Sequence, residues 1–524
     1  MLHGTHTFSD SEFSGNGHLL FENCTVRLIG EEMFARDAGF VWELGDSATV
    51  ELHKAVSFEH GHLRWNNGRF TAGSTNALLV LGGTTRSGVL EVLDEGTIPT
   101  FAAHRLDVPI ENYARMEMSE PSVIDGGSDS TIDNFGLFVL QRGVPFSFHG
   151  SAPPWLVNHS GGVLRRQGAE DDLTIIDGYG LVNEGQIQVM AGTLQLNSLA
   201  VAADHYLRDG GQLTGPGKLL LWAGNLYLDG STVISKFSSL QIFHGHVQGK
   251  GTLTGPGFVQ WEQGTFSGNV TLGPDLTTHL KGPDGRFLKG LLKNQGRLFW
   301  DQGPLTLDDD GLLRNEGRMI LSDGVQLNSI AVWTTPDLYN KGLIEIAPNT
   351  GLFTSAVTFW QSPRGRLRIK IGGYTPRTQF DRLAAQVPPK LGGTLEVQLV
   401  GGFKPVAGDV FQVMTWPSYN RQFARVVPTV IAPGLAWEPE YTPAGLNLKA
   451  IKSRTVNSPT VLTNGGFGLT LGADPASAAI IEASTNLVDW APIATNAPFT
   501  GLWDFVTFDL TNYPHRFFRA RWVP

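Results

Sequence analysis

The chain has 524 residues, 64 of them glycine, and a formal net charge of −10. This length exceeds one ordinary globular core, so we expect several domains or one long repeat. With 41% hydrophobic and 17% charged residues, the composition is not that of a disordered protein. The 39 Lys and Arg residues are scattered, which argues against a nucleic-acid partner and against a polybasic membrane patch.

Cysteine usage and apolar runs add two further limits. Cys24 is the single cysteine, so no internal disulfide forms, and we expect a small buried side chain there. No apolar run approaches the length that a membrane-spanning helix needs, so no membrane span is predicted. The start, MLHGTHTFSDSEF, lacks the basic and apolar regions of a signal peptide. If the protein is exported, we expect its leader to be absent from this sequence.

Region 1–180 alternates like strands but repeats only weakly. Stretches 7–30 and 48–73 place apolar residues at every second position, the period of a β-strand. The pattern fades over 105–127, where we expect a protruding loop or a cap.

A clearer repeat follows, built from Asn and Gly, a short alternating strand, Gly, and another strand. The stretch VNEGQIQVMAGTLQLNSLAV at 182–201 has a partner, RNEGRMILSDGVQLNSIAV, at 314–332. Shorter copies carry Asn294, Asn315 and Asn340, each about one solenoid coil after the last, and LTGPG recurs at 213 and 253. Asn and Gly tolerate the left-handed backbone of sharp turns, so each unit predicts strands joined by tight turns.

These units favour a parallel β-helix over a β-propeller. A coil of about 21 residues cannot bury its apolar face alone, so coils stack and equivalent residues line up in ladders. Equivalent Asn residues would form a hydrogen-bonded ladder along a turn. The 40-residue offset also fits propeller blades, but the shorter spacings do not. We predict an all-β chain with a right-handed parallel β-helix over 1–371, of roughly 17 coils.

The repeat ends near residue 372, and 372–450 is predicted to cap the solenoid. The pattern is a Phe380-Asp381-Arg382-Leu383 strand, a Gly-Gly-Thr-Leu strand at 392–395, and a turn with Phe403, Pro405, Gly408 and Asp409. This pattern resembles an element of bacterial secreted, autotransporter-like β-helix proteins. The resemblance implies a cap over the open sheet edge, which would otherwise promote aggregation.

After a linker at about 451–457, residues 458–524 are predicted to form a small β-sandwich. IIEASTNLVDWAPIATN at 480–496 and YPHRFFRARWV at 513–523 resemble a C-terminal module of large exported proteins from environmental bacteria. The resemblance implies attachment, sorting or glycan binding, and it bears on architecture more than on activity.

Two acidic clusters are candidates for chemistry. Polysaccharide hydrolases of this fold need carboxylates on adjacent coils, one as acid and one to activate water. Asp171, Asp172 and Asp177 are the catalytic candidates, although solvated turns between coils are the simpler interpretation. The run Asp308, Asp309 and Asp310 is a turn or a partial calcium shell, since calcium needs six to eight oxygens. No cofactor is expected, and calcium is the alternative.

Three tryptophans recur at equal spacing, Trp222, Trp261 and Trp300. An exposed row would be a ligand-binding platform on which sugar rings stack, whereas a buried row would be core packing. Both interpretations stay open at this point.

The sequence therefore favours a secreted or cell-surface scaffold or adhesin, with polysaccharide or cell-surface glycan bound along the solenoid. Many weak contacts on a repeated surface would add up by multivalency. The alternatives are a polysaccharide lyase or glycoside hydrolase, and a filament subunit that self-associates.

Overall fold

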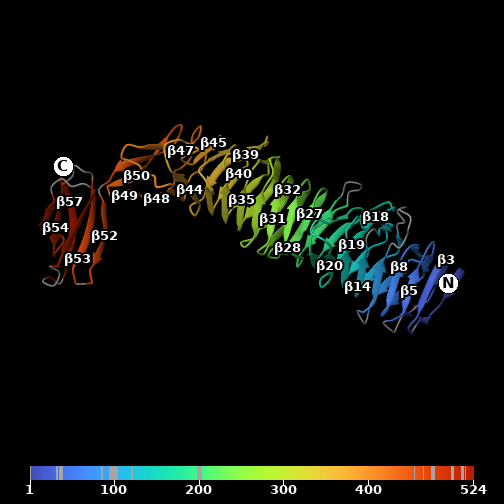
Figure 1. Ribbon diagram of the computed structural model, residues 1–524. Coiled ribbons are helices and arrows are strands. Elements are labelled where there is room, and N and C mark those ends of the chain that lie inside the picture. The colour runs from blue at the N-terminus through green and yellow to red at the C-terminus, as the bar shows by residue number, and fades with distance from the viewer. Residues whose placement is uncertain are drawn as a thin grey trace. The chain divides into compact units, whose positions relative to one another are not determined.

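The computed structural model is an all-β chain, a parallel β-solenoid of about 15 turns followed by small antiparallel sheets (Figure 1). The predicted fold class is thus confirmed. Two compact units divide the chain, one of residues 1–320 and 327–338 and one of 321–326 and 339–524. The structure describes every residue except 1, 14, 31–32, 35–38, 84–86, 94–103, 120–121, 198–202, 433, 454, 464, 474–477, 497–500, 509–512, 514 and 524.

Three strands make one coil in the first unit, and each pairs in parallel with the strand one coil later. We name the faces after one coil: face 1 carries β13 (Ile110–Asn112), face 2 β14 (Arg115–Met118) and face 3 β15 (Ile124–Gly126). Their partners in the next coil are β16 (Ile132–Asn134), β17 (Leu137–Leu140) and β18 (Phe146–Phe148). The first corner joins faces 1 and 2, and the second corner joins faces 2 and 3.

The structure has fewer turns than the sequence predicted, because its coils are longer than expected. Face 1 continues from Asn134 to Asn158 in β19 (Trp155–Asn158) and to Asn183 in β22 (Gly180–Asn183). Both steps are longer than the step from Asn294 to Asn315 on which the expected coil length was based. The connections between strands account for the added length, and fewer coils therefore fit into the chain.

Later coils of the first unit merge faces 1 and 2 into one long strand. These strands are β28 (Asn225–Ile234), β30 (His246–Thr254), β32 (Gly264–Leu272) and β34 (Arg286–Asn294). Each bends at the first corner instead of ending there. Face 3 stays separate, with β27 (Lys218–Leu221), β29 (Ser239–Ile242), β31 (Phe258–Trp261), β33 (Thr277–Leu280) and β35 (Arg297–Trp300).

Inward side chains of successive coils stack into columns that form a continuous core. On face 3 one column runs Leu221, Ile242, Trp261, Leu280 and Trp300, and all five side chains are buried. Each such aliphatic side chain contributes roughly 1.5–3 kcal/mol by leaving water. Cys24 is also buried, as expected from the sequence.

Two expectations about the repeats are wrong. Residues 104–126 form β12 (His104–Asp107) to β15 in regular coils, apart from the undescribed 120–121, so 105–127 is neither a loop nor a cap. Asn183 and Asn315 are not equivalent either. Asn183 ends β22 at the first corner, whereas Asn315 ends β37 (Leu312–Asn315) at the second. All three faces use the same strand and turn chemistry, so the local pattern does not specify the face.

In the second unit, parallel pairing continues past residue 371. β44 (Arg366–Ile371) pairs with β46 (Thr394–Leu399), which pairs with β48 (Arg425–Val427). β47 (Val410–Thr415) then pairs in parallel with β45 (Arg382–Ala385) on one side. On its other side it pairs antiparallel with β51 (Gly445–Lys452), which continues to β50 (Leu435–Thr442). An antiparallel hairpin therefore covers the edge of β47, within the region predicted as the cap.

The motif residues of this region are structural. The Asp381 carboxylate is buried and accepts hydrogen bonds from the amides of Gly351 (2.9 Å) and Lys370 (2.8 Å). Asp409 accepts hydrogen bonds from the Val406 amide (2.7 Å) and the Tyr374 hydroxyl (3.1 Å), which closes the turn before β47.

The C-terminal residues form two antiparallel sheets that share a core. One sheet is β52 (Thr455–Val461), β53 (Phe467–Ala473) and β56 (Gly501–Thr507), and the other is β55 (Ala491–Asn496), β54 (Ala478–Ser484) and β57 (Phe517–Val523). The core side chains come from both sheets: Leu469, Leu471, Phe505, Ala479 and Ile481.

The motif of the C-terminal module also holds the fold together. Glu482 pairs with Arg519 (2.8 Å) and Arg521 (2.9 Å), and the Arg519 guanidinium lies 4.2 Å from the centre of the Trp490 ring. These contacts give Glu482, Trp490, Arg519 and Arg521 a structural role in the C-terminal sheets.

Candidate binding surface

The predicted catalytic carboxylates lie in turns of the solenoid. Asp172 accepts a hydrogen bond from the Ala169 amide (2.7 Å) and lies 3.5 Å from the buried Arg166 guanidinium. Asp177 accepts hydrogen bonds from the Gly178 amide (3.1 Å) and from the Asn197 side-chain amide (3.3 Å). Asp171 is exposed. Two of the three carboxylates thus organise backbone turns, and a catalytic role for them stays a prediction.

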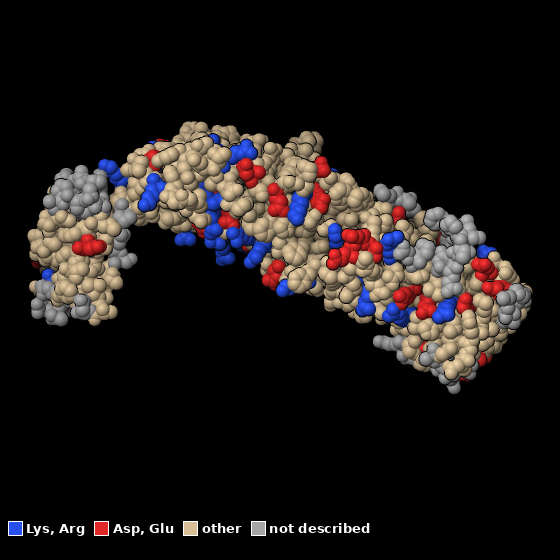
Figure 2. Space-filling view, in the orientation of Figure 1, with Lys and Arg blue, Asp and Glu red and all other residues tan. Residues whose placement is uncertain are grey.

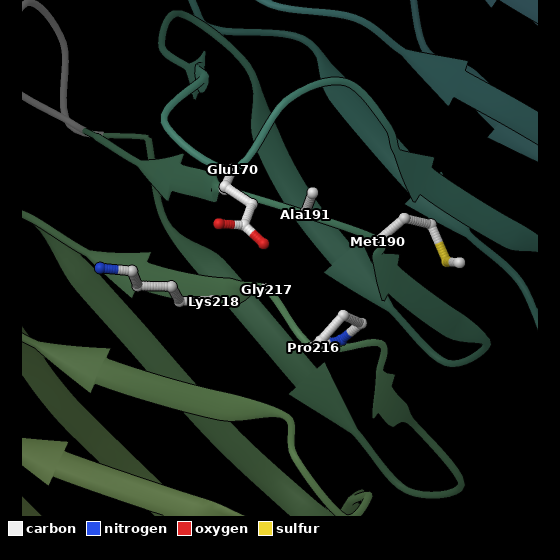
Figure 3. Close-up of a pocket in the computed structure, with 7 residues that line it drawn as sticks. Glu170, Met190, Ala191, Pro216, Gly217 and Lys218 are labelled. Carbon is white, nitrogen blue, oxygen red and sulfur yellow. The ribbon is translucent and has the colours of Figure 1, made fainter.

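A small cavity of about 210 Å³ lies beside this acidic loop. Its lining residues are Glu170, Met190, Ala191, Gly192, Pro216, Gly217 and Lys218 (Figure 3). In the figure, Glu170 and Lys218 reach one side of the cavity, and Met190 and Pro216 lie on the other. The volume is below the roughly 300–1,000 Å³ of ordinary ligand pockets. Asp171 and Asp172 do not line it, so the cavity adds no support for catalysis there.

The second acidic cluster organises a loop. Asp308 lies 3.5 Å from the Lys289 ammonium. Asp309 Oδ1 accepts hydrogen bonds from the amides of Val332 (2.8 Å), Trp333 (2.7 Å) and Thr334 (3.0 Å). The amides of Trp333 and Thr334, with a smaller share from Val332, lower the pKa of Asp309 because they stabilise the carboxylate.

Calcium binding at Asp308, Asp309 and Asp310 gains no support from this geometry, since the Asp309 oxygen already serves three amides. Within the described residues, no group of three or more His, Cys, Asp or Glu side chains has a geometry suited to a metal ion.

The three predicted tryptophans do not form one surface row. Trp261 and Trp300 are 1% and 0% exposed and alternate with aliphatic residues in the face-3 core column. Trp222 follows the column position Leu221 and points outward at 36% exposure. Trp261 and Trp300 are buried in the core, so neither ring can contact a ligand. Of the three tryptophans, Trp222 therefore remains the candidate ligand contact.

Outer aromatic ladders exist elsewhere, at spacings of one coil. Tyr206 stacks on Tyr227 with ring centres 4.8 Å apart, and Trp222 stacks on Phe243 at 4.6 Å. Tyr113, Phe135 and His159 form a third stack at 4.6 and 4.1 Å. In-register stacking covers ring faces with neighbouring rings and leaves mainly edges outward. These ladders therefore stabilise the surface more than they present ring faces to a ligand.

One exposed aromatic ring is not part of such a ladder. Trp333 is 87% exposed at the tip of the loop that Asp309 holds, beside Val332 (75%) and Ile330 (51%). In the described part of the chain, no stacking partner of the Trp333 ring is found. Trp333 was not among the candidate residues predicted from the sequence, although the apolar run IAVW directly after a repeated strand was a signal for it.

Three in-register positions on face 1 belong to the same coils. They are Phe287 in β34, Thr306 in β36 (Leu305–Leu307) and Asn328 in β39 (Gln326–Ser329). Phe287 is 39% exposed and Asn328 is half-buried, whereas Thr306 is buried at 8% exposure. We call Phe287, Lys289, Asp308, Asn328 and Trp333 together the Trp333 platform.

Charge is finely mixed on the solenoid. Figure 2 shows red and blue groups interspersed on the visible face. Many are ion pairs between neighbouring coils, such as Arg64–Glu91 at 3.0 Å and Arg208–Glu184 at 2.8 Å. Among the described residues, no helix is long and apolar enough to cross a membrane.

Comparisons with known proteins show a distant likeness of fold. No protein-family model and no curated protein matches the chain. The Haemophilus influenzae Hap adhesin is 12% identical with a TM-score of 0.28, and the match covers 86% of this chain and 63% of that one. The TibC-catalyzed hyper-glycosylated TibA55-350 fragment is 11% identical with a TM-score of 0.20, and 81% and 100% are covered. The chain thus spans less than two thirds of the Hap adhesin chain.

Proposed function

We propose that this chain is an extracellular or cell-surface scaffold of the adhesin kind that binds polysaccharide on the outside of its solenoid. The supporting observation is the Trp333 platform, in which an exposed ring stands on a loop fixed by Asp309, in the same coils as the half-buried Asn328 and the Lys289–Asp308 pair. Rigid display lowers the entropy cost of binding, because the surface is ordered before the ligand arrives. Repeated coils add further weak contacts to the same polymer.

The runner-up, a polysaccharide-degrading enzyme, needs two carboxylates free to act on one glycosidic bond. Asp172 and Asp177 are each engaged with turn amides, which supports binding over catalysis. A filament subunit is the third candidate, and no contact among the described residues favours it.

The test is incubation of the full chain with neutral and acidic polysaccharides, with retention on each polymer and release of new chain ends scored together. Retention without new ends is the expected result. New chain ends would overturn the proposal and direct attention to Asp171, Asp172 and Asp177. Light scattering that grows with protein concentration would instead support the filament.

A further inference from the structure

The loop 330–334 combines exposure with fixed geometry. The large apolar side chains of Trp333, Val332 and Ile330 are 87%, 75% and 51% exposed. Their contact with water is unfavourable in free energy, and the fold does not require it. The same loop is held by three amide bonds to a single oxygen of Asp309. A segment ordered in this way keeps the indole ring in one position relative to face 1.

The polar side chains of face 1 in these coils offer hydrogen bonds. Asn328 carries a half-buried amide, and the Lys289–Asp308 pair adds a donor and an acceptor. Thr306, at the register of Asn328, is buried and offers no surface hydroxyl. Phe287 supplies a second, half-exposed ring one coil before Thr306, and successive coils repeat at about 4.8 Å. The platform therefore combines two aromatic rings with polar groups.

The side chains of the platform favour one class of ligand over the others. A protein partner would be expected to require a continuous apolar centre, and Asn328 and the ion pair interrupt one here. Anionic lipid is disfavoured because Asp308, Asp309 and Asp310 lie at the base of the loop. A sugar polymer has both apolar ring faces and hydroxyl edges, and it matches rings and polar groups together.

We propose that the Trp333 platform is the polysaccharide-binding site of this chain, a refinement that rests on the proposed function. Trp333 stacks on the apolar face of one sugar ring, and Asn328 and the Lys289–Asp308 pair bind hydroxyl groups of the neighbouring sugars. Asp309 is a positioning residue, since its carboxylate fixes the loop without facing the sugar.

The experiment is affinity electrophoresis of the full chain in gels containing hydroxyethylcellulose, xylan, polygalacturonate or alginate. Trp333→Ala is expected to weaken retention at least tenfold, and Phe287→Ala less. Trp360→Ala is the matched control, because Trp360 is a surface tryptophan (37% exposed) whose ring lies 4.8 Å from the Lys390 ammonium, and retention should stay within twofold of the wild type. Since the Trp333 side chain is exposed, its removal leaves the core intact.

Asp309 variants test positioning separately from stability. Asp309→Asn keeps an oxygen that accepts the three amides and should restore most of the retention that Asp309→Ala loses, with both thermal midpoints near that of the wild type. Retention that Trp333→Ala leaves unchanged would overturn the platform while the proposed function stands. No retention of the wild type in any of the four gels would overturn both. A Trp333-dependent interaction with phosphatidylcholine vesicles but with none of the gels would overturn the sugar assignment.

Discussion

The first corner of the solenoid is built in two ways within one unit. In the coils of β13 to β22, the buried side-chain amides of Asn112, Asn134 and Asn158 each donate at 2.7 Å to the oxygen of the next Asn, and the column ends at Asn183. Farther along the same column stand Leu207 and Leu228, and then Gly249, Gly268 and Gly290. These glycines have φ of +92°, +105° and +133° and bend the long strands without ending them.

The difference shows what a corner must provide. Where two separate strands meet, the turn exposes carbonyl groups. The amides of Asn112, Asn134 and Asn158 therefore also donate to a carbonyl of the following coil, as Asn134 does to Val163 (3.2 Å). Where one strand bends, its backbone stays paired, and the corner needs a left-handed residue instead. A Cβ at Gly268 would stand 2.4 Å from the Gly249 carbonyl oxygen, so no other residue fits.

Breaking the Asn column should have the largest effect. Asn134 donates to Gly136, Asn158 and Val163 and accepts from Asn112, all in a buried position. Asn134→Ala leaves several buried polar groups unpaired, and we expect a loss of about 3 kcal/mol or more.

Asn294 is the matched control, since it stands in the second-corner column. Its side-chain amide donates to the Asn315 side-chain oxygen (2.8 Å) and to the Arg318 backbone carbonyl (3.3 Å). Asn294→Ala should cost about 2 kcal/mol on the same principle. Urea unfolding of both variants measures the two losses of unfolding free energy. Equal losses would refute the prediction that the first-corner Asn column stabilises the fold more than the second-corner column.

Acid should weaken the coil where the Asn column ends. His205 is buried in β25 (His205–Arg208), and this burial lowers its pKa from 6.5 to about 4, partly offset by a backbone hydrogen bond and by Asp204. The unfolded chain then binds more protons between these values, so stability present above pH 6.5 is lost as pH falls toward 4.

The expected loss is about 3 kcal/mol at most, from the size of the pKa difference. His205→Leu should flatten this part of the profile of unfolding free energy against pH, whatever its effect at neutral pH. A slope that persists in the variant would assign the acid sensitivity to another group.

The glycine column can be tested with a pair of substitutions. Gly268→Ala combines a left-handed backbone with the close carbonyl oxygen, whereas Gly161 has a φ of +88° and nothing within 4 Å of an added Cβ. Gly161→Ala should cost about 1–2 kcal/mol from the backbone alone. We expect Gly268→Ala to lower the thermal stability clearly more than Gly161→Ala does. Similar losses of stability would show that the backbone at the bend shifts readily to accommodate the added Cβ.

The smallest effect concerns the loop at Asp309. Because the loop amides lower the pKa of this carboxylate, its anchoring is present above the ordinary pKa of about 4 and is lost as pH falls through the lowered value. Hydrogen exchange at the amides of Val332, Trp333 and Thr334, corrected for intrinsic rates, should show protection that weakens as pH is lowered through the acid range below about 4. Asp309→Asn should remove this pH dependence, and a wild type whose protection in acid is no more pH-dependent than that of the variant would contradict it.

Some features of this protein followed from the sequence by itself. Period-two alternation, Asn-Gly turns and the short spacing of the repeats predicted the parallel solenoid, because local backbone preference and burial act within a few residues. The antiparallel C-terminal region was also foreseen. The sequence further identified Asp309, although as a calcium candidate and not as the anchor of a loop.

The tertiary structure alone decided which face each residue occupies. Asn183 and Asn315 share a local motif but stand at different corners, since register depends on the lengths of all the preceding connections. Trp222, Trp261 and Trp300 share a spacing, yet an offset of one residue turns Trp222 outward while Trp261 and Trp300 point into the core, because successive strand residues point to opposite sides. The meeting of Asp309 with Trp333 required stacked coils, which bring residues a full coil apart in the sequence into contact.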